Sequence, residues 1–308
     1  MESESTSIIE NTFKIEEEKA TKIVFIINPV SGTQKKEDIV TLIHETLKLS
    51  GIHYDIAYTN FAGHAIELAK QASESNYDVV VAVGGDGTIN EIAQTLIKTK
   101  TALAIIPQGS GNGLARHLGI PLGTEEAIKR LLEPKKIVID AATANGNYFF
   151  CTSGVGFDAH VSASFASRAF RGLGGYAYFT LRELFSYKPL NYTLEFDNQQ
   201  VKKEAFLVTF ANASQYGNNA YIAPQADIQD GKLDICILKP FPALQAIKII
   251  WQVFKRTLPQ NEYIETYKVS KVKITFDTAI PAHIDGESRG LGTSIEYKVI
   301  SKALTVWV

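Results

Sequence analysis

The sequence has little cysteine and little excess charge, and both shortages exclude whole classes of protein. It contains two cysteines, Cys151 and Cys236, and each stands in an apolar run. We therefore expect buried, reduced thiols rather than a disulfide framework or a cysteine-rich metal centre. The formal net charge of −2 provides no overall attraction for nucleic acid, so no nucleic-acid partner is expected. This composition predicts a cytoplasmic globular protein.

The sequence also lacks an apolar run long enough to cross a bilayer. Its most apolar helical stretch, residues 244–254, is too short and is interrupted by polar residues. Any association with a membrane is therefore expected to be peripheral. Residues 1–20 carry six glutamates and no apolar core, which excludes a signal or transit peptide and predicts a loose acidic tail.

Residues 21–140 show the alternation of strand and helix that is typical of an α/β domain. Aliphatic runs predict strands at 22–27, 52–59, 79–83 and 102–106, with helices between them at 37–49, 62–73 and 89–97. This order predicts a doubly wound parallel sheet with helices on both faces. The carboxyl ends of all its strands should lie along one edge.

Residues 141–308 change to strands in succession with turns between them. Strands are predicted at 190–196, 205–211, 233–238, 267–276 and 294–297, and Asn145-Gly146-Asn147 predicts a hairpin turn. This pattern predicts an antiparallel β-sandwich. The last strand, 304–308, belongs either to the sandwich or to the first domain.

Gly84-Gly85-Asp86-Gly87-Thr88 connects the buried strand at 79–83 to the helix at 89–97. Glycines let a phosphate approach the backbone, and the unpaired N–H groups of a helix N-terminus attract its charge. An acid in such a loop repels phosphate unless a cation lies between them, so Asp86 indicates Mg²⁺ and a nucleotide. The alternative is a structural turn in which Asp86 caps the helix.

Two further loops fall on the same edge of the predicted sheet. Asn28-Pro29-Val30-Ser31-Gly32 follows the first strand, and Pro107-Gln108-Gly109-Ser110-Gly111-Asn112-Gly113 follows the fourth. Ser110 and Asn112 are candidate donors to phosphate or sugar oxygens, and the alternative for each is an ordinary helix cap. The sequence has no Gly-Lys-Ser/Thr, so the predicted phosphate site differs from a P-loop.

The segments INPVSG, VAVGGDGTINEIAQTL and AIIPQGSGNGLARHLGIP resemble the diacylglycerol kinase catalytic domain family, which includes bacterial lipid kinases, sphingosine kinases and ceramide kinases. The resemblance continues through residues 154–158, 230–234 and 284–287, and it covers nearly the whole chain after Lys22. It implies an α/β domain like those of NAD kinase and phosphofructokinase, followed by a β-sandwich, with ATP held between the two.

The resemblance also implies which residues form the site. Nucleotide contacts are expected from Asn28, Pro29, Val30, Ser31, Gly32, Thr59, Gly84, Gly85, Asp86, Gly87, Thr88, Ile89, Asn90 and Ser110. Glu287 is implied as the general base, because a lipid hydroxyl is a poor nucleophile until a carboxylate accepts its proton. The alternative for Glu287 is a surface acid in a hairpin turn.

A second metal site is implied near residues 227–232. Its ligands would be Asp227 and Asp230 with Lys232, whose carbonyl oxygen alone is a suitable ligand. The alternative is a plain Asp-Gly hairpin turn.

Residues 165–188 interleave aromatic side chains with arginine and lysine. Such a segment either docks on anionic headgroups or packs into the core with its cations in solvent.

Together these features predict a kinase that uses ATP and Mg²⁺ and reaches a membrane lipid from the membrane surface, with diacylglycerol as the acceptor. Three alternatives remain: a kinase of sphingosine or ceramide, an NAD kinase, whose family also carries Gly-Gly-Asp-Gly-Thr, and an inactive nucleotide-binding module that is recruited to membranes. The sequence allows a homodimer.

Overall fold

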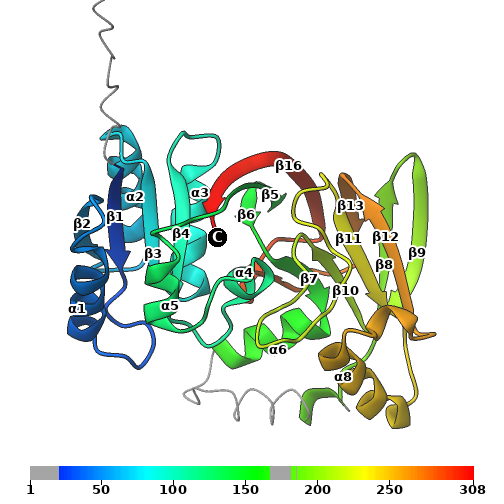
Figure 1. Cartoon of the computed structure of the whole chain (residues 1–308). Coiled ribbons are helices and arrows are strands. Elements are labelled where there is room, and N and C mark those ends of the chain that lie inside the picture. Colours follow the sequence, from blue (N-terminus) through cyan, green and yellow to red (C-terminus); the bar gives the residue numbers. More distant parts are fainter. Residues whose placement is uncertain (1–20, 167–181, 185) are drawn as a thin grey trace, which may run out of the picture.

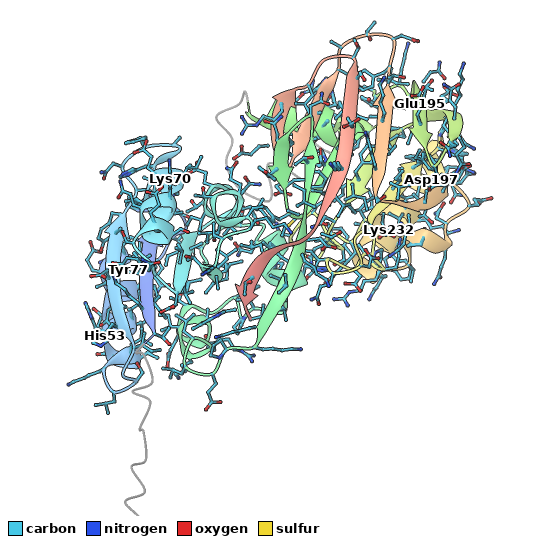
Figure 2. All side chains as sticks on the ribbon, turned by 90° about the horizontal axis from the view of Figure 1, so that it is seen from above. His53, Lys70, Tyr77, Glu195, Asp197 and Lys232 are labelled. Carbon is cyan, nitrogen blue, oxygen red and sulfur yellow. The ribbon has the colours of Figure 1, made fainter. Side chains whose placement is uncertain are left out.

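The structure is a computed structural model of the chain, and it describes residues 21–166, 182–184 and 186–308 (Figure 1). The predicted acidic tail, 1–20, and most of the basic aromatic segment, 165–188, lie outside the described residues. The described residues form an α/β domain and a β domain side by side. Figure 2 shows them from above, with His53 and Tyr77 on the first domain and Glu195 and Lys232 on the second.

Four parallel strands form the centre of the α/β domain, in the order β2-β1-β3-β4. Their bounds are β1 Lys22–Ile27, β2 His53–Tyr58, β3 Val79–Gly84 and β4 Ala102–Pro107. All residues of β3 and β4 are buried. Their uninterrupted aliphatic sequences are what a parallel strand covered on both faces requires.

Helices cover both faces of this sheet. They are α1 Lys36–Leu47, α2 His64–Glu74, α3 Asp86–Leu96, α4 Gly113–His117 and α5 Thr124–Lys129. On one face Ile39 of α1 and Ile128 of α5 join the core, and on the other Ala69 of α2 and Ile92 of α3 do so. The predicted doubly wound α/β domain is confirmed.

The β domain is a sandwich of two antiparallel sheets. One has the order β12-β11-β10-β7-β14-β15, and the other is the run β16-β13-β8-β9. In the core between them the rings of Phe210 and Tyr297 stack with centroids 3.7 Å apart. The predicted β-sandwich is confirmed. The strands are β5 Lys136–Ala144, β6 Asn147–Phe149, β7 Thr152–Gly156, β8 Leu190–Phe196, β9 Gln199–Ala205, β10 Leu207–Ala211, β11 Leu233–Leu238, β12 Ile264–Val269, β13 Lys271–Thr275, β14 Pro281–Ile284, β15 Glu287–Gly290 and β16 Ser294–Trp307.

Short helical segments accompany this domain within the described residues. They are α6 Phe157–Ala166, η1 Ala243–Gln245, α8 Ala246–Lys255 and η2 Leu258–Gln260. Helices α6 and α8 lie on the lower side of the view in Figure 1.

Strand β16 connects the two domains. Its first part pairs antiparallel with β13, and near its end Val306 pairs parallel with Leu103 of β4. Figure 2 shows this red strand running from one domain to the other. The segments 294–297 and 304–308 therefore lie almost entirely in one strand with an irregularity between Ile300 and Leu304. Strand β5 runs without a break through the predicted boundary at residue 140, and that boundary stays a prediction.

Two predicted strands are wrong, and the sandwich explains both errors. Residues 267–276 form β12 and β13 with a break at Ser270, and residues 205–211 span a break at Phe206 between β9 and β10. At each break the chain leaves one sheet and enters the other. Alternating apolar residues continue through such a corner, so the sequence pattern shows no interruption.

Candidate active site

The three glycine-containing loops meet at the carboxyl edge of the α/β sheet, and they approach one another very closely. A Cβ atom on Gly109 would lie 2.8 Å from the Cα atom of Gly85. Gly32 has a φ of 71°, and a Cβ atom there would lie 2.6 Å from the carbonyl oxygen of Gln108. The glycines at these positions are therefore required by contacts between loops, which joins the three motifs into one site.

Asn28 fixes the first loop to the second. Its side-chain amide donates to Thr88 Oγ1 at 2.9 Å, while its Oδ1 accepts from the N–H of Val30 at 3.1 Å. Asn28 and Thr88 thus hold the turn after β1 against the start of α3. Val30 projects from this turn and is 89% exposed.

The Asp86 carboxylate is hydrogen-bonded to the third loop. Its Oδ2 accepts from the N–H of Asn112 at 2.9 Å, and its Oδ1 accepts from the N–H of Gly113 at 2.8 Å. Burial raises the pKa of this carboxyl above 3.8, and the two backbone donors oppose the rise. Asp86 does cap a helix, but the helix is α4 rather than α3. Its role toward Mg²⁺ stays a prediction.

Asn112 and Ser110 have different surroundings in the third loop. The Asn112 side chain bonds to both the N–H and the carbonyl of Gly109, at 2.9 and 2.8 Å, and it is buried. Its φ of 50° lies in the left-handed region that asparagine tolerates. Asn112 therefore shapes the loop, whereas the Ser110 hydroxyl is exposed at the loop surface and is free to meet a ligand.

The remaining predicted contacts differ in access. Thr59 is buried, and its N–H donates to Ile27 at 3.0 Å. Ile89 is 1% exposed and belongs to the core, so its side chain is closed to a nucleotide. Asn90 donates to Asp285 Oδ2 at 2.9 Å and to the carbonyl of Tyr148 at 3.2 Å. Asn90 thus connects the two domains.

Asp285 was missed as a site residue, and it anchors the β14–β15 hairpin to the rest of the site. Its carboxylate accepts from the backbone N–H groups of Phe150, Cys151 and Thr152 at 2.9–3.0 Å, in addition to Asn90. Burial raises the pKa of this carboxyl, and its donors oppose the rise. The hairpin turns at Asp285 and Gly286, both with positive φ.

Glu287 is the first residue after this turn, and it faces the start of α3. Its Oε1 would lie 3.0 Å from a Cβ atom on Gly87. Its Oε2 accepts from Arg289 Nη2 at 2.9 Å, and its side chain is 58% exposed. The anchored hairpin thus places this carboxylate beside Gly87 in the first turn of α3.

A cleft of about 180 Å³ separates α3 from the hairpin. Its walls include Asp86, Gly87 and Asn90 on one side and Asp285 and Glu287 on the other. Residues predicted to contact the nucleotide and the residue predicted as the general base therefore line the same cleft.

Lys36 is a second residue that was missed. It is 9% exposed, and its ammonium group donates to the carbonyls of Ser31 and Gln34 beneath the first loop. Burial lowers the pKa of this group. A lysine at the start of a helix gives no sequence signal for such a position.

The implied second metal site stays a prediction, and one of its acids, Asp230, already has a cationic partner. The Lys268 ammonium lies 2.5 Å from Asp230 Oδ2 and 3.5 Å from Asp234 Oδ2, so a cation already neutralises these acids. The Lys232 side chain is exposed, and Asp227 accepts from the N–H of Gln229. Among the described residues no group of three His, Cys, Asp or Glu side chains could hold a metal ion.

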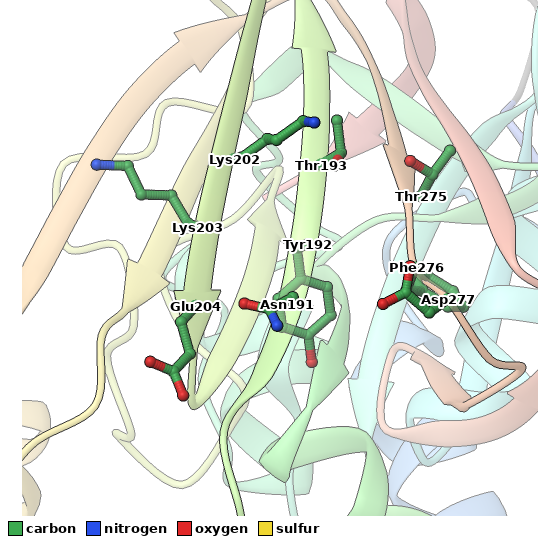
Figure 3. Close-up of a pocket in the computed structure, with 9 residues that line it drawn as sticks. All are labelled: Asn191, Tyr192, Thr193, Lys202, Lys203, Glu204, Thr275, Phe276 and Asp277. Carbon is green, nitrogen blue, oxygen red and sulfur yellow. The ribbon is translucent and has the colours of Figure 1, made fainter.

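A larger hollow of about 480 Å³ lies on the outer sheet of the β domain, between β8, β9 and β13 (Figure 3). It is lined by side chains such as Thr193, Lys202, Glu204 and Asp277 and by none of the loops described above. This hollow is therefore separate from the candidate site, although it is larger than the cleft.

The helices of the described residues include none that is long and apolar enough to span a membrane.

Two family models match consecutive parts of the chain. The diacylglycerol kinase catalytic domain family matches residues 22–144, and the YegS C-terminal NAD kinase beta sandwich-like domain matches residues 152–308. A YegS-like protein of Chromohalobacter salexigens, named a probable lipid kinase, is 32% identical over 77% of this chain and 78% of its own length. The diacylglycerol kinase of Bacillus subtilis is 28% identical over 89% of this chain and 91% of its own.

Solved structures show the same fold. The crystal structure of a Bacillus anthracis str. Sterne protein described as a diacylglycerol kinase matches with a TM-score of 0.78 and 25% identity, over 92% of this chain and 94% of that one. The joined glycine loops, the hairpin that carries Glu287 and the extent of these matches lead to one conclusion: the chain belongs to the diacylglycerol kinase catalytic domain family.

Proposed function

We propose that the protein is a lipid kinase that transfers the γ-phosphoryl group of ATP to a hydroxyl of a membrane lipid, with diacylglycerol as the acceptor. The observation that carries the proposal is the position of Glu287 beside Gly87 in the first turn of α3. An exposed carboxylate there can meet an acceptor hydroxyl, while the N–H groups of α3 and of the loops meet phosphate oxygens.

In the proposed reaction the Glu287 carboxylate accepts the proton of the acceptor hydroxyl. The acceptor oxygen forms a bond to the γ-phosphorus, and the bond from that phosphorus to the β–γ bridging oxygen breaks, which releases ADP. Such a transfer requires chiefly positioning and neutralisation of charge. The exposed Ser110 hydroxyl and the loop backbone would orient the triphosphate.

Mg²⁺ would neutralise the charge of the triphosphate, and Asp86 is the residue that would hold it. A carboxylate has about four acceptor positions. The N–H groups of Asn112, Gly113 and Asp86 itself occupy three of them, so Asp86 retains an acceptor position and lines the cleft.

The test is the glutamate-to-glutamine variant Glu287→Gln, assayed with ATP, Mg²⁺ and diacylglycerol. We expect kcat to fall by about 10²–10⁴-fold, the range of general-base catalysis, with ATP affinity unchanged. The matched control is Glu296→Gln, which removes an acid that is ion-paired with Lys271 on the same domain, away from the cleft. Full activity of Glu287→Gln would remove the assigned base.

The acceptor is tested separately. The purified protein is incubated with radiolabelled ATP and diacylglycerol, a sphingoid base, ceramide or NAD in turn. We expect diacylglycerol to be labelled fastest. Labelling of a sphingoid base, of ceramide or of NAD alone would assign the acceptor to an alternative, and tight ATP binding without turnover would indicate an inactive module.

A further inference from the structure

Helix α8 exposes an apolar face that the described part of the protein leaves uncovered. Together with η1 it spans residues 243–255. Large side chains recur on one side with helical spacing and are strongly exposed: Leu244 92%, Ile247 78%, Ile250 39%, Trp251 57% and Phe254 54%. A helix that is apolar on its outer side as well as its inner side requires an apolar environment on both.

The inner side of α8 shows that the helix is a fixed part of the fold. Ile249 is 6% exposed and joins an apolar cluster with Leu258 and Ile264. Buried Gln252 accepts from the Asn261 side-chain amide at 2.5 Å. The exposed face is therefore held in place by the protein beneath it.

The charges within this segment of the sequence have one sign. From Lys239 to Asn261 the sequence contains Lys239, Lys248, Lys255 and Arg256 and no acid, although the whole chain has a net charge of −2. Lys248 and Lys255 are exposed, and the Lys255 ammonium lies 5.9 Å from the centre of the Trp251 ring. Tryptophan, phenylalanine and flanking lysines on one helix are the composition of helices that lie in the interface of an anionic bilayer.

The position of α8 in the molecule is compatible with contact to a bilayer. In Figure 1 the helix lies on the lower side of the molecule, the side toward which the carboxyl end of β1 also points. The first glycine-containing loop begins at that end of β1. A flat surface against α8 would therefore lie on the same side of the molecule as the loops of the candidate site.

We propose that the exposed face of α8 is a membrane-docking surface that inserts Leu244, Ile247, Trp251 and Phe254 into the interface of a bilayer containing anionic lipid. Lys248 and Lys255 then meet the headgroups. The inference rests on the proposed function, because a lipid kinase must bind a membrane to reach its acceptor. Its test, however, requires no phosphoryl transfer.

The fluorescence of Trp251 reports docking directly. The chain has two tryptophans, and the other, Trp307, is 8% exposed and lies in the α/β core. We expect phosphatidylcholine vesicles that contain phosphatidylglycerol to shift the emission to shorter wavelength, and expect Trp251→Phe to abolish the shift. Added salt should weaken binding, because it screens the lysines. No shift in wild-type protein would overturn the proposal.

A matched pair of leucines distinguishes docking through α8 from non-specific hydrophobic binding to vesicles. Leu244 is 92% exposed on this face, and Leu49 is 94% exposed beyond the end of α1 in the other domain. In co-sedimentation with the same vesicles, Leu244→Ser combined with Ile247→Ser should bind at least about tenfold more weakly, whereas Leu49→Ser should bind like wild type. Equal binding by all three proteins would overturn the proposal.

One further outcome concerns another occupant of the face, and two separate docking from the proposed function. If the serine variants change the mass of the protein in solution from dimer to monomer and leave vesicle binding intact, the face is an interface between copies and the proposal fails. If Trp251 reports binding but no lipid is phosphorylated, the proposed function fails and docking stands. Turnover of detergent-dispersed diacylglycerol without vesicle binding would overturn docking alone.

Discussion

The Glu287 carboxylate lies against Gly87, so close that a Cβ atom on the glycine would be 3.0 Å from Oε1. Gly87 belongs to the helix that begins at the second glycine-containing loop, and Glu287 belongs to a hairpin of the other domain. This contact brings the proposed base to the edge of the proposed phosphate site. It leaves no room for a methyl group unless the carboxylate moves.

Gly87→Ala should therefore reduce activity without reducing stability. Alanine replaces glycine within α3, which stabilises a helix by up to about 1 kcal/mol. The new methyl group displaces the Glu287 carboxylate by a few tenths of an ångström. Since a misplacement of about 1 Å can cost about 10²-fold, we expect kcat to fall by up to about 10-fold. Gly290→Ala is the control, since a Cβ atom there meets nothing within 4 Å. Assays and urea denaturation of both variants check the prediction, and a loss of stability without a loss of kcat would contradict it.

Asp86→Ala should loosen the third loop. The substitution leaves the N–H groups of Asn112 and Gly113 without their acceptor, at a cost of about 2–3 kcal/mol in the free energy of unfolding. Because that loop abuts Gly85, ATP affinity should fall as well. Glu67→Ala, which removes an exposed acid in α2, should stay within about 0.5 kcal/mol of wild type. Urea denaturation and ATP titration measure both effects, and an unchanged free energy of unfolding would refute the capping role.

Asp285→Asn should change how stability depends on pH. Burial raises the folded-state pKa of Asp285 above 3.8, so between 3.8 and that pKa the folded protein binds more protons than the unfolded chain. The contribution of Asp285 to the free energy of unfolding is therefore greatest below pH 3.8, and it falls as the pH rises through the folded-state pKa.

The amide of Asp285→Asn does not titrate, so the stability of wild type relative to this variant should fall over the same interval and then become constant. Urea denaturation of both proteins at a series of pH values measures the difference. A difference that does not vary with pH would contradict the raised pKa.

The sequence was most informative where burial alone determines structure. Strands β1, β3 and β4 were predicted because parallel strands covered on both faces need continuous aliphatic runs. The meeting of the three loops also followed, because parallel strands share a carboxyl edge. The breaks at Phe206 and Ser270 were missed, because alternating residues continue where a strand changes sheet.

Within the site, residues that act through long-range hydrogen bonds were beyond prediction. Asp285 accepts from Phe150, which is 135 residues away in sequence, and Lys36 is defined by the fold of the loop above it. Glu287 was reached only through the family resemblance, since an acid after Asp-Gly is ordinary in a hairpin. The role of Asp86 toward Mg²⁺ stays a prediction, and in the structure its carboxylate accepts from the N–H groups of Asn112 and Gly113 in the third loop.

The course of β16 has a consequence for how the protein is made. Strand β4 ends at Pro107, whereas its neighbour in the sheet begins only at Ser294. Strands β1 to β4 therefore emerge from the ribosome long before β16, which completes their sheet, has been synthesised. Domains that are contiguous in sequence fold one after another during synthesis. In this chain the edge of β4 stays unpaired until β16 has been synthesised, so the sheet of the first domain can be completed only at the end of synthesis.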